Sequence, residues 1–154
     1  MSLEQLMKKE KQEQEKRILS SFEIAEMFQV AEQKPRDCMM LKCLYYLGLS
    51  NSEVQNLQVA DFNFENSKVR VVRGAKKTVR DVTIPSGFDQ EVKQFLAGLS
   101  GIVFSGRSSG KVSDRHIRRI VKSYACKAKI ENGSEIHPHS LKDSYEFHVK
   151  NSTD

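Results

Sequence analysis

One segment, residues 45–57, constrains the fold of this chain more than any other. Its sequence is YYLGLSNSEVQNL. Gly48 suits the left-handed residue that ends many helices. Ser52 and Gln55 have the spacing of a capping box, in which two side chains satisfy the free amides at a helix start. The segment therefore predicts two helices joined by a tight turn at Gly48.

Further helices are predicted wherever apolar residues recur at helical spacing next to a start or stop signal. Ser20 and Glu23 form another capping box, and the helix that follows places Phe22, Ile24, Ala25, Met27, Phe28 and Ala31 on or near one face. The helix over 36–47 is apolar around most of its circumference, which predicts the central helix of the core. The complete set of expected helices is 20–34, 36–47, 52–59, 88–99, 113–129 and 138–150.

The pattern changes to a period of two between residues 68 and 85. Val69 and Val71 alternate with polar residues, and Val82 and Ile84 do so on the return. The residues 74–77 lie between the two runs, so we predict a β-hairpin with its turn there. Residues 61–67 are expected to be a polar connection. The fold class is then mainly α with a small antiparallel β-sheet (α+β).

Length and composition support one domain with its own core. A chain of 154 residues suits a single domain, which we place at 20–154 after a charged leader or linker at 1–19. No stretch is apolar over a membrane-spanning length, so no membrane is expected as a partner. Cys38, Cys43 and Cys126 lack metal-ligand spacing, and we interpret them as buried free thiols in a cytosolic protein, with no metal site.

Two boxes of residues resemble those of a known family. The first opens with Arg36-Asp37, continues through the Gly48 turn to Ser52-Glu53, and closes with Leu57 and Asp61. The second runs from 138 to 148 and reads PHSLKDSYEFH. Both are similar to boxes of the tyrosine recombinases, or phage integrases, of the XerC/XerD-like kind. The resemblance covers 20–154 and implies the catalytic-core fold of that family, without a cofactor.

The resemblance also implies positions for the site residues. Ser50 stands where the family has its first catalytic arginine, and Lys142 stands where it has the second. His139 matches the family's histidine, which assists proton transfer. Lys77 is the candidate for the hairpin lysine that protonates the leaving oxygen, with Lys76 as the alternative if the turn shifts by one residue.

These departures predict that DNA cleavage has been lost. The phosphorane formed during cleavage concentrates negative charge that guanidinium groups match with two donors each. Ser50 supplies no charge, and Lys142 supplies a charge without the fork. We expect the nucleophilic tyrosine to lie beyond the region covered by this chain. Tyr124 and Tyr145 are interpreted as core residues, and His148 as structural.

Basic residues concentrate in two stretches that we predict to face double-stranded DNA. The net charge is +5, and phosphate contacts of this kind give weak, salt-sensitive binding without reading bases. The predicted DNA-binding residues are Arg73, Lys76, Lys77 and Arg80 in the hairpin, then Arg107, Lys111, Arg115, Arg118, Arg119 and Lys122 in and before the helix at 113–129.

The leading hypothesis is a DNA-binding recombinase core that no longer cleaves, with other recombinase protomers as further partners and a cytoplasmic, nucleoid-associated location. Two alternatives stay open. The chain could be a fragment of an active integrase that needs the missing tyrosine segment. It could instead be a protein-interaction or regulatory module that retained the fold without binding DNA.

Overall fold

The computed structural model describes residues 2–8, 17–74, 78–106 and 110–151. Residues 3–8 are helical and exposed. The remaining elements are, in order, α2 (Ser21–Ala31), α3 (Pro35–Tyr46), α4 (Asn51–Asn56), the 3-10 turn η1 (Val59–Asp61), β1 (Phe62–Asn63), β2 (Lys68–Arg73), β3 (Thr78–Thr83), α5 (Phe88–Leu96), α6 (Asp114–Lys127), the 3-10 turn η2 (Gly133–Glu135) and α7 (Pro138–Asn151).

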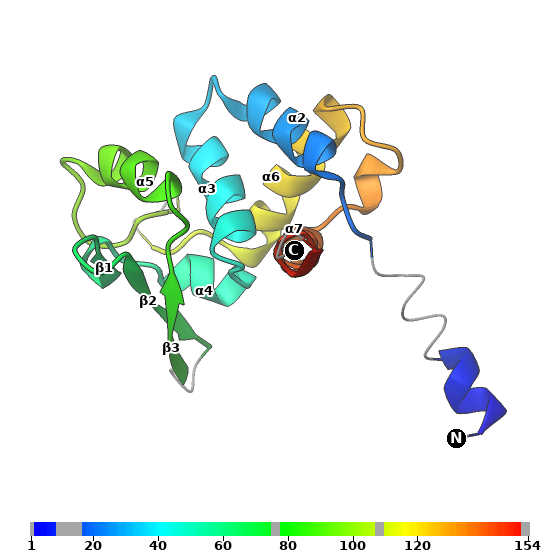
Figure 1. The fold of residues 1–154 in the computed structure, drawn as a ribbon. Helices are drawn as coiled ribbons and strands as arrows, with labels where there is room; N and C mark the ends of the chain where they lie inside the picture. Colours follow the sequence, from blue (N-terminus) through cyan, green and yellow to red (C-terminus); the bar gives the residue numbers. More distant parts are fainter. Residues whose placement is uncertain (1, 9–16, 75–77, 107–109, 152–154) are drawn as a thin grey trace.

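Helix α3 lies at the centre, as its apolar circumference predicts. It packs against α2, α4, α5 and α7, with the sheet and α5 on one side and α2, α6 and α7 on the other (Figure 1). Met40, Leu41 and Leu44 are fully buried. Pro35 occupies the first turn of the helix, where the missing amide hydrogen costs nothing.

The predicted hairpin is confirmed as part of a three-stranded antiparallel sheet of order β1-β2-β3. Val69 pairs with Val82 across β2 and β3, and Val69 and Val71 are fully buried. The expected polar connection at 61–67 was wrong in part, because it contains β1, which pairs with the start of β2. Phe62 and Phe64 stack there with ring centroids 5.7 Å apart, and this partly buried pair holds the short strand.

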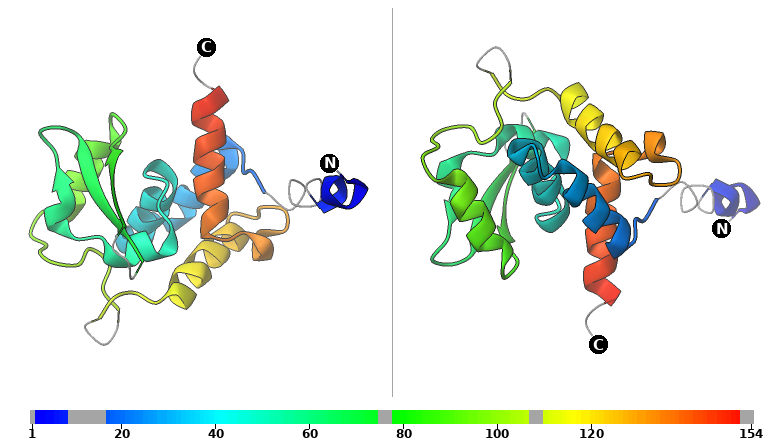
Figure 2. Two further views of the ribbon diagram at one scale, coloured as in Figure 1. Left: turned by 90° about the horizontal axis from the view of Figure 1, so that it is seen from below. Right: turned by 90° about the horizontal axis from the view of Figure 1, so that it is seen from above.

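Helices α6 and α7 complete the domain. Ser113 caps α6 by accepting the His116 amide at 3.0 Å, and the inner face of α6 is buried around Ile117 and Val121. Both panels of Figure 2 show α7 with its amino-terminal end beside α6 and its carboxyl end pointing away. The first residues of α7 therefore lie close to α6.

Several sequence-based details were wrong. Phe22 is 73% exposed and Ala25 is also exposed, so the core-facing stripe of α2 is narrower than predicted, with Ile24, Met27 and Ala31 buried. Helix α5 ends at Leu96, ahead of Gly98 with its φ of 82°. Helix α6 ends at Lys127, because Lys129 takes a left-handed φ of 57°.

Packing of the domain begins before α2, at Leu19. Leu19 is fully buried, and its amide donates to Ser144 Oγ at 2.8 Å, so packing against α7 already begins there. Cys38 and Cys43 are buried as predicted, but Cys126 is exposed on α6. Within the described ranges, no helix has the length and apolarity that crossing a membrane requires.

Candidate functional site

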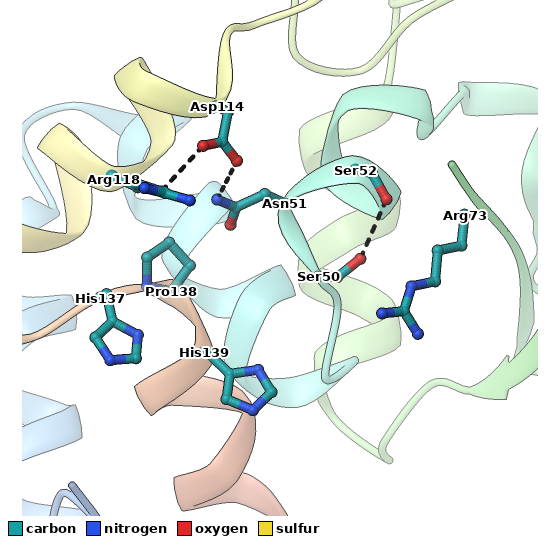
Figure 3. A pocket seen from close by; sticks show the side chains of 9 residues that line it. All are labelled: Ser50, Asn51, Ser52, Arg73, Asp114, Arg118, His137, Pro138 and His139. Atoms are coloured by element: carbon teal, nitrogen blue, oxygen red, sulfur yellow. Dashed lines mark hydrogen bonds and ion pairs between the residues drawn. The ribbon is translucent and has the colours of Figure 1, made fainter. Parts of the chain in front are cut away.

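A pocket of about 550 Å³ opens beside Ser50. Figure 3 shows that its walls come from α4, β2, α6 and α7. The residues that line it are Ser50, Asn51 and Ser52 at the start of α4, Arg73 at the end of β2, Asp114 and Arg118 on α6, and His137, Pro138 and His139 at the start of α7. We call this the Ser50 pocket.

Ser50 lies in the pocket wall because it begins α4. Its Oγ accepts the Glu53 amide at 3.3 Å, and its own amide donates to Glu53 Oε1 at 2.8 Å. The capping box is thus formed by Ser50 and Glu53, and the prediction from Ser52 and Gln55 was wrong by two residues. A carboxylate in the first turn also interacts favourably with the helix dipole. The Gln55 side chain instead donates to the Val112 carbonyl oxygen at 2.9 Å.

Helix α4 ends at Asn56, earlier than the predicted end near Val59. The backbone turns at Leu57 into the extended region, and the 3-10 turn η1 follows. Gly48 has the expected left-handed φ of 59°. The turn that joins α3 to α4 was therefore predicted correctly, and the helix that follows it begins earlier and is shorter.

Glu53 and Arg80 lock this turn to the sheet. Arg80 Nε donates to Glu53 Oε2 at 2.9 Å, and Arg80 Nη2 donates at 3.1 Å both to Glu53 Oε1 and to the Gly48 carbonyl oxygen. Burial alone would raise the pKa of Glu53, but hydrogen bonds from Arg80 and Ser50 outweigh burial and hold that pKa below its ordinary value. In this structure the predicted DNA contact Arg80 holds the Gly48 turn.

The cationic side chains of the pocket come from β2 and α6. In Figure 3, the guanidinium of Arg73 is directed toward Ser50 and Ser52, and Arg118 reaches in from the opposite wall. Arg118 Nε lies 3.0 Å from Asp114 Oδ2, and Asp114 Oδ1 accepts the side-chain amide of Asn51. Both side chains of the Arg118–Asp114 pair are exposed. The pair therefore positions the Arg118 side chain but adds little to stability.

The two histidines close the pocket from the start of α7. His139 is exposed, and its Nε2 lies 3.3 Å from Asp143 Oδ1 one turn further along the helix. Pro138 lies in the first turn of α7. His139, which the sequence identified, and His137, which it did not, thus lie on the same wall across from Arg73 (Figure 3).

The structure brings together only part of the predicted site. Ser50, Arg73, Arg118 and His139 share the Ser50 pocket. Lys142 does not line it, but its Cγ would lie 3.8 Å from a Cβ on Gly48, so the lysine stem packs beside the same turn. Three predicted residues, Lys76, Lys77 and Arg107, lie outside the described residues.

The remaining predicted DNA contacts lie on and before α6. Lys111, Arg115 and Arg119 line a second basic pocket, and Lys122 is exposed on the same helix. The sequence pattern placed Arg115, Arg119 and Lys122 on the outer face of the helix and predicted no cavity. The Ser50 pocket as a whole was likewise not predicted. Asn51 and Asp114 are 63 positions apart in the chain, and only the fold brings them together.

The tyrosines behave as core residues. Tyr124 is 4% exposed and donates to Asp37 Oδ2 at 2.6 Å. Burial and the nearby Asp37 carboxylate raise the pKa of Tyr124. Tyr145 packs edge-on against Tyr45, whose hydroxyl lies 2.6 Å from His148 Nδ1. Neither Tyr124 nor Tyr145 lines the Ser50 pocket, and His148 is structural, as predicted.

The pocket is suited to an anion rather than to a metal ion. Two guanidinium groups and two imidazoles face a single carboxylate, Asp114. Guanidinium groups and imidazoles recognise phosphate oxygens through charge-assisted hydrogen bonds. Across the part of the chain that the structure describes, no group of three or more His, Cys, Asp and Glu residues is arranged to hold a metal.

Comparison with known sequences identifies relatives of this chain. The sequence model for the group described as "Phage integrase family" matches residues 11–153. A tyrosine recombinase of Pseudothermotoga lettingae is 30% identical over 129 residues, covering 82% of this chain and 44% of the relative. Tyrosine recombinase XerA of Pyrococcus furiosus is 29% identical over 138 residues, covering 85% of this chain and 47% of the relative. The chain thus spans less than half the length of these curated relatives.

Solved structures with the same fold lead to the same group. The crystal structure of XerA recombinase superposes with a TM-score of 0.78 at 20% identity, covering 89% of this chain and 52% of that one. The XerH site-specific recombinase bound to its difH substrate gives a TM-score of 0.71 at 17% identity, covering 88% of this chain and 43% of that one. At 20% and 17% sequence identity, these two structures show a similarity of fold alone.

Proposed function

Because this chain belongs to the phage integrase family of tyrosine recombinases, we propose that it is a DNA-binding catalytic-core domain for site-specific recombination and integration. Its ligand is double-stranded DNA, held mainly through the phosphate backbone. The related XerH recombinase was solved bound to its difH substrate, which supports DNA as the partner here.

The observation that carries this proposal is the composition of the Ser50 pocket. The family's first arginine is absent at Ser50, yet Arg73 and Arg118 line the same pocket from β2 and α6. A phosphate placed there would meet both guanidinium groups and His139. Arg118 could exchange its exposed pairing with Asp114 for the phosphate at little cost. Binding of a phosphodiester is therefore retained after the family residue has changed.

We propose further that this chain by itself does not cleave DNA efficiently. The hydroxyl and the backbone amide of Ser50 both form hydrogen bonds in the capping box of α4. Lys142 does not line the pocket. Removing a single donor that stabilises the developing charge costs about 10²–10³ in rate. Tyr124 and Tyr145, both placed in or against the core, are unsuited to attack a phosphate in the pocket.

Other recombinase protomers are proposed as additional partners. Phe147 and Val149 on α7 are 49% and 42% exposed, which leaves apolar surface near the carboxyl end of that helix for a neighbouring chain. We also propose a location in the cytoplasm, in association with the nucleoid, because the proposed ligand is DNA.

Salt-dependent binding tests the proposal. Fluorescence anisotropy with two duplexes of unrelated sequence should show similar affinities for both, falling steeply as salt rises from about 50 to 200 mM. Absence of binding at the lower salt concentration would overturn DNA as the ligand. Incubation with a duplex should leave no covalent protein–DNA adduct on a denaturing gel, and an adduct would overturn the proposed loss of cleavage.

A further inference from the structure

A second cavity, of about 750 Å³, lies between the start of α3 and the start of α6. Its basic lining residues are Lys34, Arg36, Lys111, Arg115, His116 and Arg119. Three of these, Lys34, Arg36 and His116, are not among the DNA-binding residues predicted from the sequence. We call this cavity the Arg36 pocket.

Two of the basic side chains of the Arg36 pocket, Arg36 and Lys111, donate hydrogen bonds to neutral acceptors. Arg36 Nη2 donates to the Ser105 carbonyl oxygen, and Lys111 Nζ donates to Asn56 Oδ1. In the described part of the chain, none of the ion pairs involves a cationic residue of this pocket. Acceptors such as these fix the position of a cation without neutralising it.

One carboxylate, Asp37, also lines the Arg36 pocket. Its Oδ2 accepts the buried hydroxyl of Tyr124 at 2.6 Å, which ties this carboxylate to the core. Five lysine and arginine residues line the pocket with this one carboxylate, so positive charge exceeds negative charge in its lining. Like charges gathered in a concave surface create a strong local potential for anions.

The Arg36 pocket lies beside the Ser50 pocket. Asp114 and Arg118 of α6 line the Ser50 pocket, whereas Arg115 and Arg119 line the Arg36 pocket. Consecutive helical residues are rotated by about 100°, so the two pockets occupy neighbouring sides of the first turns of α6. A phosphate backbone that crosses the start of this helix would meet both.

We propose that the Arg36 pocket is a second anion site, which binds a phosphate group of the DNA backbone away from the Ser50 pocket. This proposal rests on the proposed function, since it takes DNA as the ligand. The second site adds contacts that carry no sequence information, and it brings the segment before α3 into the DNA-binding surface.

The test compares two double variants of the full chain with equal loss of charge. Lys34→Gln/Lys111→Gln alters the Arg36 pocket, and Lys93→Gln/Lys129→Gln alters exposed lysines that line neither pocket. The slope of log affinity against log salt should fall by about 0.9 in the first variant, because the pocket is proposed to bind one phosphate group. It should stay at the wild-type value in the second. Thermal melts check that both variants remain folded.

The outcomes separate this inference from the proposed function. If wild type binds DNA and both double variants keep its salt slope, the Arg36 pocket does not bind DNA, while the proposed function stands. If wild type binds no DNA, both proposals fail. In NMR titrations, a duplex should shift the amides of Arg36 and Ser113. Shifts caused by inorganic phosphate but not by the duplex would mark a site for free phosphate and overturn the DNA assignment.

Discussion

Replacing Arg80 by alanine tests the lock between the sheet and the Gly48 turn. The substitution removes three hydrogen bonds, two to Glu53 and one to the Gly48 carbonyl oxygen. It leaves the Glu53 carboxylate, whose side chain is 2% exposed, without its cationic partner. The bond from the Ser50 amide remains, so the capping box is weakened rather than lost.

The expected loss of stability follows from the burial of the two partners. Breaking a fully buried ion pair costs about 3–5 kcal/mol. The side chain of Arg80 is 45% exposed, so water can reach the space that it vacates. Solvent screening reduces the expected loss to about 2 kcal/mol. For a domain of this size, that loss corresponds to a fall in Tm of about 4–8 °C.

Urea denaturation of wild type and Arg80→Ala at neutral pH measures the effect. Arg70→Ala, an exposed change on the neighbouring strand β2, is the matched control and should cost less than about 0.5 kcal/mol. A cost for Arg80→Ala no larger than that of the control would refute the reasoning, because the buried carboxylate would then not depend on its guanidinium partner.

The pH dependence gives a second check on the same pair. The pKa of Glu53 is lowered in the folded protein, so its contribution to stability is present above the ordinary value of 4.5 and is lost as the pH falls through the folded value. The gap between wild type and Arg80→Ala should therefore narrow in acid. A gap that stays constant down to acid unfolding would assign the loss to something other than the Glu53 charge.

Three further changes test individual contacts. Ser50→Ala removes the hydroxyl that accepts the Glu53 amide and should cost about 1 kcal/mol in thermal melts; an unchanged Tm would mean that this hydroxyl contributes nothing. Tyr124→Phe removes the donor to Asp37 and should cost about 1–2 kcal/mol in urea denaturation, and a neutral result would contradict this role. Burial raises the pKa of Tyr45 to about 12, so the contribution of Tyr45 to stability should disappear as the pH rises through that value. Phenolate absorbance of wild type compared with Tyr45→Phe measures the ionisation of Tyr45. Ionisation near pH 10 would contradict the raised pKa.

Local patterns in the sequence were enough to predict most elements of the fold. The apolar circumference of α3, the two-residue period of β2 and β3, and the cap at Ser113 each depend on neighbouring residues. The same applies to Gly48, whose left-handed φ follows from its place after a helix. Strand β1 was missed because two residues are too few to show a period, and only pairing with β2 defines it.

The capping box shows why a local rule can select the wrong residues. Both Ser50 with Glu53 and Ser52 with Gln55 have the required spacing. The first pair is used because Glu53 is also held by Arg80 from β3, a contact that the sequence around Ser50 cannot reveal. The Ser50 pocket was likewise not predictable from local sequence, because only the fold brings Arg73, Arg118 and His139 together.

The central claim is that the Ser50 pocket binds a DNA phosphate with Arg73 and Arg118. The most direct measurement is the salt dependence of duplex binding by Arg73→Gln/Arg118→Gln, with Lys93→Gln/Lys129→Gln as the control of equal charge. We predict that the slope of log affinity against log salt falls by about 0.9 in the first variant, because the two arginines hold one phosphate, and is unchanged in the control. An unchanged slope in Arg73→Gln/Arg118→Gln would contradict the claim.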